Sequence, residues 1–145
     1  MRLRLIACSF AFLTSVSWAQ TDAVLATAAK EAGAQVTKSG LVYRSLKDGT
    51  GSSPQATDRV KVHYKGNFPD GKEFDSSYKR GEATEFPLNG VIPCWTEGMQ
   101  LMKTGGKAKL TCPSAIAYGQ RGAGGVIPPN ATLVFEVELL GINGK

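Results

Sequence analysis

Aromatic and aliphatic residues recur between Val60 and Leu140 in an order that could line one shallow apolar pocket. The aromatic residues concerned are Tyr64, Phe74, Phe86, Trp95, Tyr118 and Phe135. Aromatic rings bury large apolar areas and pack edge to face, so together they offer a dry surface for an apolar group. Each ring alone is more typical of a hydrophobic core than of a pocket, and only the joint arrangement favours a pocket.

Groups for covalent or acid–base catalysis are scarce in this chain. Its one histidine, His63, falls on the polar face of a predicted strand, where we expect a solvated or structural role. The sequence contains no GxSxG elbow, no HExxH, no P-loop and no GxGxxG that opens a helix. The glycine-rich stretch 122–125 precedes VIPP, which indicates a flexible loop. Cys94 and Cys112 lie far from the histidine and do not form a zinc-ligand pattern with it, so we expect neither metal nor cofactor.

The elements that must position these rings are several strands and one short helix. Strand-like patterns cover residues 41–47, 59–65, 84–88, 107–112 and 132–142. In the second of them Val60, Val62 and Tyr64 alternate with polar residues and therefore share one face. The tripeptide PDG at 69–71 predicts a turn that returns the chain into residues 73–75.

Residues 94–102 have helical spacing, which places Trp95, Met99 and Met102 on one face. Pro93 near the start and two glycines after the end are typical helix boundaries. Several antiparallel strands with one short helix predict an α+β fold, in which the helix packs on the concave face of a twisted sheet.

Six segments of this sequence together resemble the FKBP family of macrolide-binding peptidyl-prolyl cis-trans isomerases. They are VKVHYKG (60–66), FDSS (74–77), FPLNGVIPCW (86–95), EGMQLMKTGGKAKL (97–110), IAYG (116–119) and VIPPNATLVFEVELL (126–140). Their order and intervals are similar to those of the family over roughly the last hundred residues. The resemblance implies a twisted antiparallel β-sheet wrapped around one short α-helix, and it implies isomerase activity on Xaa-Pro bonds. Rotation about such an amide breaks no covalent bond and needs no nucleophile.

The resemblance also implies a role for each residue of the pocket. Trp95 would be the floor, with Tyr64, Phe74 and Phe135 as walls, closed by Val91 and Ile92. Phe86 would be a further substrate-binding residue. The Ile92 N–H and the Tyr118 hydroxyl would donate hydrogen bonds to substrate carbonyls. Asp75 would pair with Arg80 at the rim, and Ile127 would cover the proline from its loop. Three positions depart from the family pattern and leave residue preference and macrolide affinity open: Thr84, Cys94 and Ala123.

The first residues have the pattern of a cleaved export signal. Arg2 and Arg4 precede an apolar run at 5–16, and Ser17-Trp18-Ala19 offers small residues before Gln20. A lipoprotein signal ending at Cys8 is the weaker alternative, since it leaves almost no apolar segment before the cleavage point. We expect a signal peptide at 1–19, a short Ala-rich lead-in at 20–38 and an FKBP-type domain at 39–145 with its core at 57–144. The expected location is the periplasm or the exterior of a bacterium.

The lead-in is expected to contain a helix at 21–33 that is either loose or weakly docked. Exported relatives of the macrophage-infectivity-potentiator type have a long helical dimerisation region before this domain, so the short lead-in favours a monomer. Loss of 1–19 would leave 15 basic and 12 acidic residues, a net charge of +3 scattered among acids and turns. Such an ordinary solvated surface argues against nucleic acid as a partner. The apolar run is too short for stable membrane insertion.

Two cysteines, Cys94 and Cys112, remain after the predicted cleavage point. In an oxidising compartment they could form one disulfide, and the alternative is two buried thiols that never meet. The expected partners are proline-containing unfolded or nascent exported proteins and macrolide inhibitors. A non-catalytic chaperone or protein-binding module that uses the same pocket is the alternative function.

Overall fold

The computed structural model describes residues 16–144 of the chain. Most of the predicted signal peptide, including Cys8, therefore lies outside the described residues. Within them, no helix combines the length and the apolar character that crossing a bilayer requires.

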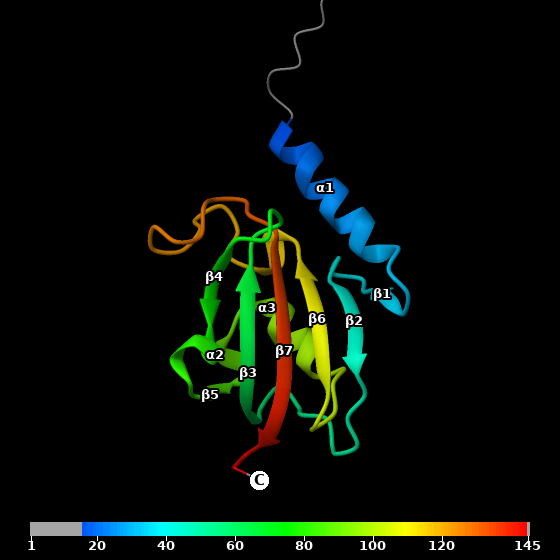
Figure 1. The fold of residues 1–145 in the computed structure, drawn as a ribbon, viewed down its shortest axis with the longest axis vertical. Helices are drawn as coiled ribbons and strands as arrows, with labels where there is room; N and C mark the ends of the chain where they lie inside the picture. Colours follow the sequence, from blue (N-terminus) through cyan, green and yellow to red (C-terminus); the bar gives the residue numbers. More distant parts are fainter. Residues whose placement is uncertain (1–15, 145) are drawn as a thin grey trace, which may run out of the picture.

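One antiparallel sheet forms the body of the molecule (Figure 1). Its strands are β1 (Ala34–Val36), β2 (Val42–Lys47), β3 (Arg59–Asn67), β4 (Glu73–Ser76), β5 (Thr84–Pro87), β6 (Lys107–Cys112) and β7 (Leu133–Ile142). The order across the sheet is β1-β2-β6-β7-β3-β4, and β5 also pairs with β3. The longest strands, β3 and β7, lie at its centre and pair Tyr64 with Val137 and Gly66 with Phe135. The predicted α+β fold is confirmed.

The predicted short helix, α3 (Pro93–Met99), packs against one face of this sheet (Figure 1). The alternation predicted for β3 is confirmed, because Val60, Val62 and Tyr64 are all buried. The same face of β7 supplies a second row of buried residues, from Leu133 to Leu139. The single core therefore lies between α3 and the sheet.

The helix α3 ends three residues before the predicted end at Met102. The chain continues as a turn in which the Met102 N–H bonds the Met99 carbonyl at 3.1 Å. Met102 nevertheless remains buried, as its spacing predicts. Gly98 lets this end of the helix approach the sheet, since a Cβ there would lie 2.8 Å from Leu110 Cδ2.

Three short helices were not predicted because they are too short for a periodic pattern: α2 (Ser77–Arg80) and the 3-10 turns η1 (Leu88–Gly90) and η2 (Ser114–Ile116). The Ser76 side chain caps α2 by accepting a hydrogen bond from the Lys79 N–H at 3.4 Å. Gly81 ends it with φ +73°, a left-handed conformation that glycine adopts without strain. This small helix holds Arg80 near the start of β5.

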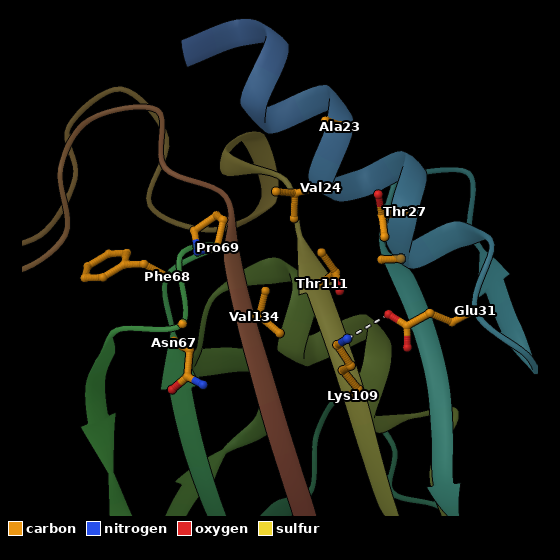
Figure 2. A pocket seen from close by; sticks show the side chains of 12 residues that line it. Ala23, Val24, Thr27, Glu31, Asn67, Phe68, Pro69, Lys109, Thr111 and Val134 are labelled. Carbon is orange, nitrogen blue, oxygen red and sulfur yellow. Dashed lines mark hydrogen bonds and ion pairs between the residues drawn. The ribbon is translucent and has the colours of Figure 1, made fainter. Parts of the chain in front are cut away.

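The first helix, α1 (Val16–Ala29), begins five residues earlier than predicted, and its end leads into the unpredicted strand β1. Glu31 connects this region to the sheet. Its carboxylate accepts a hydrogen bond from Lys109 at 2.7 Å (Figure 2) and another from Arg44, also at 2.7 Å. The Lys109 hydrogen bond is the main reason why the pKa of Glu31 lies below its ordinary value. Of the two expected alternatives, the structure shows the docked one. A shallow groove of about 380 Å³ between α1 and the sheet includes Val24 and Val134.

Candidate active site

An aromatic cleft of about 460 Å³ opens beside the first turn of α3. We call it the aromatic cleft; it is lined by Tyr64, Phe74, Asp75, Phe86, Gly90, Val91, Ile92, Trp95, Tyr118 and Phe135. These residues come from β3, β4, β5, η1, the junction between η1 and α3, α3, β7 and the loop after η2. All the residues predicted for the pocket line it except Arg80 and Ile127. Gly90 was not predicted.

Trp95 forms the base of the aromatic cleft. Its side chain is only 5% exposed, and three rings stand nearly perpendicular to the indole. The centroid distances are 5.1 Å to Tyr64, 5.7 Å to Phe86 and 5.4 Å to Phe135. Edge-to-face contacts of this kind are favourable and fix the orientation of each ring. The arrangement leaves an apolar seat above a rigid indole.

A second pair of rings forms the wall next to β4. Phe74 meets Phe135 edge to face with centroids 5.7 Å apart. Gly66 of β3 lies directly beneath both rings. A Cβ at this position would be 2.5 Å from Phe74 Cζ and 2.9 Å from Phe135 Cε1. Only glycine lets both rings lie against the strand, a requirement that no local pattern in the sequence reveals.

Replacing Gly66 with alanine should therefore displace both rings and lower the free energy of unfolding by about 1–3 kcal/mol, the usual range for an overpacked site. The measurement is a urea titration of both proteins together with the NMR shifts of the phenylalanine ring protons. An unchanged midpoint with unchanged ring shifts would contradict this account of Gly66.

The polar rim of the aromatic cleft is a closed network of three side chains. The Tyr64 hydroxyl donates to Asp75 Oδ2 at 2.6 Å, and Arg80 Nη1 donates to Asp75 Oδ1, also at 2.6 Å. Arg80 Nη2 completes the network by donating to the Tyr64 hydroxyl at 3.1 Å. Arg80 thus holds the rim without lining the cleft.

This network sets the charge state of the rim. Burial raises the pKa of Asp75, but hydrogen bonds from Tyr64 and Arg80 outweigh it and hold the pKa below its ordinary value. Burial, and then the hydrogen bond to Asp75, raise the pKa of Tyr64. The carboxylate is therefore ionised and the phenol protonated at neutral pH.

Ser77, which was not predicted to belong to the site, fixes the backbone of Tyr64 through its side-chain hydroxyl. Its fully buried hydroxyl accepts a hydrogen bond from the Tyr64 N–H at 2.8 Å and lies 2.8 Å from His63 Nδ1. The His63 ring stacks on Tyr78 with centroids 4.7 Å apart. His63 is therefore hydrogen-bonded and stacked outside the cleft, and its role in this structure is structural.

Two donors at the cleft have no hydrogen-bond partner among the described residues. They are the Ile92 N–H, at the start of α3, and the hydroxyl of Tyr118, which is 39% exposed. Burial and the nearby charge of Asp75 raise the pKa of Tyr118, so its hydroxyl keeps its proton at neutral pH. Both groups can therefore donate to a ligand that enters the cleft.

Ile127 was predicted to cover the proline from its loop. It is only 6% exposed, packs in the core and does not line the cleft. Its backbone forms a β-bridge with Ala123, with N···O distances of 2.9 and 3.0 Å. This bridge folds the loop back on itself and turns Ile127 inward.

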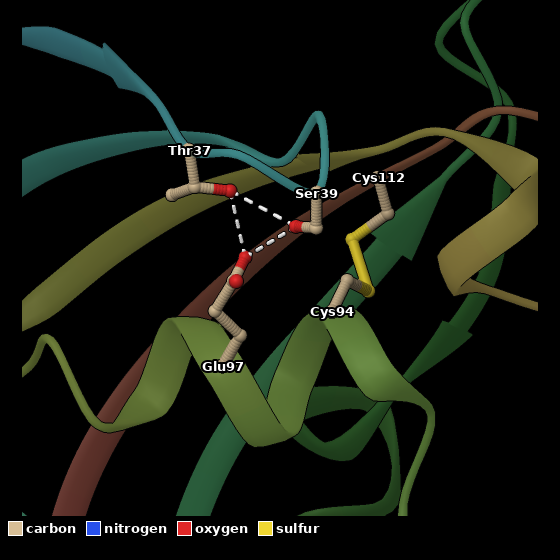
Figure 3. Close-up of a disulfide and its surroundings, with 5 residues drawn as sticks. All are labelled: Thr37, Ser39, Cys94, Glu97 and Cys112. Atoms are coloured by element: carbon tan, nitrogen blue, oxygen red, sulfur yellow. Dashed lines mark hydrogen bonds between the residues drawn. A yellow bond between two sulfur atoms is a disulfide. The ribbon is translucent and has the colours of Figure 1, made fainter.

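A disulfide joins Cys94 and Cys112, whose Cα atoms are 5.9 Å apart (Figure 3). It ties the first turn of α3 to the end of β6. Because Cys94 directly precedes Trp95, the bridge lies beside the base of the aromatic cleft.

Comparisons with known proteins agree on one family. The family model for FKBP-type peptidyl-prolyl cis-trans isomerase matches residues 50–140. The isomerase FkpA of Aeromonas hydrophila is 59% identical over 118 residues, which are 81% of this chain and 44% of that protein. The FKBP-type 22 kDa isomerase of Escherichia coli K12 is 57% identical over 114 residues, 79% of this chain and 55% of that protein. The chain spans about half the length of these curated relatives.

Solved structures give the same result. The crystal structure of FkpA from Escherichia coli superposes with a TM-score of 0.85 at 48% identity, over 89% of this chain and 60% of that one. A peptidyl-prolyl cis-trans isomerase from Pseudomonas syringae pv. tomato gives a TM-score of 0.82 at 37% identity, over 93% of this chain and 99% of that one.

Proposed function

The chain belongs to the FKBP-type peptidyl-prolyl cis-trans isomerase family, and from that premise we propose that its aromatic cleft catalyses the cis–trans isomerisation of Xaa-Pro bonds. The observation that carries the proposal is a single cleft bounded jointly by Trp95, Tyr64 and Phe135. An apolar, proline-sized seat with hydrogen-bond donors at its edge suits a reaction in which no covalent bond breaks.

The barrier to this reaction is the resonance of the amide, about 18–20 kcal/mol. A planar amide has a large dipole, which shrinks as the C–N bond twists. A dry aromatic cleft therefore disfavours the planar ground state more than the twisted state. Such differential binding is what lowers a barrier.

In this proposal each group of residues in the cleft has its own role. The indole of Trp95 supports the pyrrolidine ring, and the surrounding rings exclude water. The Ile92 N–H and the Tyr118 hydroxyl donate to carbonyls on the substrate and hold the twisted geometry. Asp75 and Arg80 keep Tyr64 in place, and the carboxylate also presents acceptor oxygens at the rim.

The wider role of the protein follows from the same proposal. Its substrates are unfolded or nascent proteins with slow Xaa-Pro bonds, and macrolides that enter family clefts inhibit it. It acts as an exported protein whose leader covers residues 1–19, and it works as a monomer through its domain at 39–145.

The test is an isomerisation assay on a short Xaa-Pro peptide, followed by NMR exchange so that no coupling protease is needed. We expect catalysis at substoichiometric protein and loss of it when an FKBP-directed macrolide is added. A protein that suppresses aggregation of unfolded chains but leaves the peptide exchange rate unchanged would instead be a binding module.

Replacing Asp75 with asparagine should lower kcat/KM about fivefold. Hydrogen bonds to charged groups stabilise by about 1.5–3 kcal/mol, and partial exposure of this rim reduces that to about 1 kcal/mol.

The wild-type carboxylate has a pKa below its ordinary value of 3.8, so its contribution is complete above that pH and is lost as the pH falls through the folded value. Rates measured from about pH 3 to pH 8 should show an acid limb that the variant lacks.

The matched control for this variant is Asp70→Asn, which removes the same charge from an exposed turn outside the aromatic cleft. The control should keep the wild-type rate and the acid limb. Equal losses in both variants would show that net charge, rather than the rim network, controls the rate.

A further inference from the structure

A second hollow lies next to the aromatic cleft, on the other side of Val91. We call it the Glu97 hollow; its volume is about 630 Å³, and it is lined by Asn89, Val91, Pro93, Thr96, Glu97 and Gln100. Val91 lines both spaces, so a polypeptide can pass from one to the other over a single side chain. Two or three extended residues reach roughly 7–10 Å.

The hollow is a fixed feature of the fold. It lies between η1 and the outer face of α3, and the Thr96 hydroxyl joins these elements by donating to the Leu88 carbonyl at 2.7 Å. Leu88 itself is fully buried in the core. Gln100 also bonds back to the helix, through its amide and the Thr96 carbonyl at 2.8 Å. A peptide would therefore meet a surface that is already in place.

Glu97 is the only ionisable residue among the described residues that line the hollow. Its Oε1 accepts hydrogen bonds from Thr37 at 2.8 Å and from Ser39 at 2.6 Å (Figure 3). Both donors come from the segment between β1 and β2, far away in the sequence. Neutral hydroxyls orient the carboxylate without cancelling its charge, and Oε2 has no partner among the described side chains.

We propose that the Glu97 hollow is a second subsite for the substrate polypeptide and that Glu97 selects a lysine or arginine a few residues from the proline. The inference rests on the proposed function, because the aromatic cleft must first hold the proline. Ile92 directly follows Val91, which lines both spaces, so the substrate segment whose carbonyl binds the Ile92 N–H is the one that extends toward the hollow in this proposal. The carboxylate then pairs with the cationic side chain at the open surface.

The experiment compares alanine-based peptides that contain one central Leu-Pro bond. Lysine or glutamine is placed in turn at each other position, and kcat/KM is measured with the purified protein. At one position we expect lysine to exceed glutamine by about two- to fivefold, the range for an exposed charge pair. The ratio should approach one in about 1 M salt, where the Debye length is about 3 Å.

The Glu97→Gln variant keeps an acceptor for Thr37 and Ser39 but removes the charge, so its lysine-to-glutamine ratio should fall to about one. Glu82→Gln removes the same charge from an exposed residue outside the hollow and should keep the wild-type ratio. A wild-type protein without lysine preference at any position overturns the subsite, as does a preference that survives in Glu97→Gln.

Amide chemical shifts separate failure of the subsite from failure of the proposed function. If no peptide is isomerised, the proposed function fails, and titration of the lysine peptide still decides the subsite. Shifts at Thr96, Glu97 and Gln100 that the glutamine peptide does not produce support the subsite. Equal shifts with both peptides, or none with either, overturn it.

Discussion

Replacing Trp95 with alanine should lower kcat/KM on an Xaa-Pro peptide by about ten- to fiftyfold. A proline ring seated on the indole buries three methylene groups, each worth about 0.8 kcal/mol. Complete loss of that contact reduces the stabilisation of the transition state by about 2.4 kcal/mol, which lowers the rate roughly fiftyfold. The rings of Tyr64, Phe86 and Phe135 remain and retain part of the contact, which sets the lower end of the range.

The same substitution should also lower the free energy of unfolding by about 3–5 kcal/mol, the usual loss for a buried tryptophan. The rate must therefore be measured where circular dichroism shows the variant to be folded. Met99→Ala is the matched control, because Met99 is fully buried on the same helix but does not line the aromatic cleft. It should be destabilised by about 2–5 kcal/mol and keep the wild-type kcat/KM while folded.

Two outcomes would contradict this account of Trp95. A folded Trp95→Ala protein with wild-type kcat/KM would show that the proline does not bind on the indole. Equal rate losses in Trp95→Ala and Met99→Ala would show that the rate follows the integrity of the core rather than the surface of the cleft.

The sequence predicted best those parts of the structure that repeat with a period. The alternation of Val60, Val62 and Tyr64 identified β3 and its buried face, and helical spacing identified the buried face of α3. Both patterns exist because a residue faces the core only at intervals fixed by the backbone. Together with the family resemblance, they were enough to name most residues that line the aromatic cleft.

Features that depend on tertiary contacts could not be predicted in this way. Ile127 turns inward because Ala123 bridges to it across a glycine-rich loop, and a loop has no period. Gly66 is required because two rings, Phe74 and Phe135, pack on it from other strands. Ser77 accepts a hydrogen bond from the backbone N–H of Tyr64, which lies on β3. The docking of the N-terminal region depends on Glu31 and Lys109, which are 78 positions apart. None of these contacts produces a recognisable pattern in the neighbouring amino-acid sequence.

Removing the Cys94–Cys112 bridge should lower the free energy of unfolding by about 3 kcal/mol. The cysteines are 18 positions apart, and in the chain-entropy model a crosslink that closes a loop of this length restricts the unfolded state by about that amount. The unfolded chain also becomes more expanded, so the urea m-value should rise. For a domain of this size the midpoint of thermal unfolding should fall by roughly 10 °C or more.

Reduction of the wild-type protein provides the sharpest measurement, because it breaks the bridge and leaves both sulfur atoms in the core. The double variant Cys94→Ala/Cys112→Ala adds the loss of packing, since both residues are fully buried, and should be somewhat less stable than the reduced protein. Equal urea midpoints for the oxidised and reduced proteins would show that the bridge does not stabilise the fold.

Activity should respond differently from stability. The Trp95 indole is held by three perpendicular rings as well as by the helix that carries it, so its position does not depend on the bridge alone. We therefore expect the reduced protein, while folded, to keep most of its kcat/KM, in contrast to Trp95→Ala. A reduced, folded protein whose kcat/KM fell tenfold would instead show that the bridge itself positions the base of the aromatic cleft.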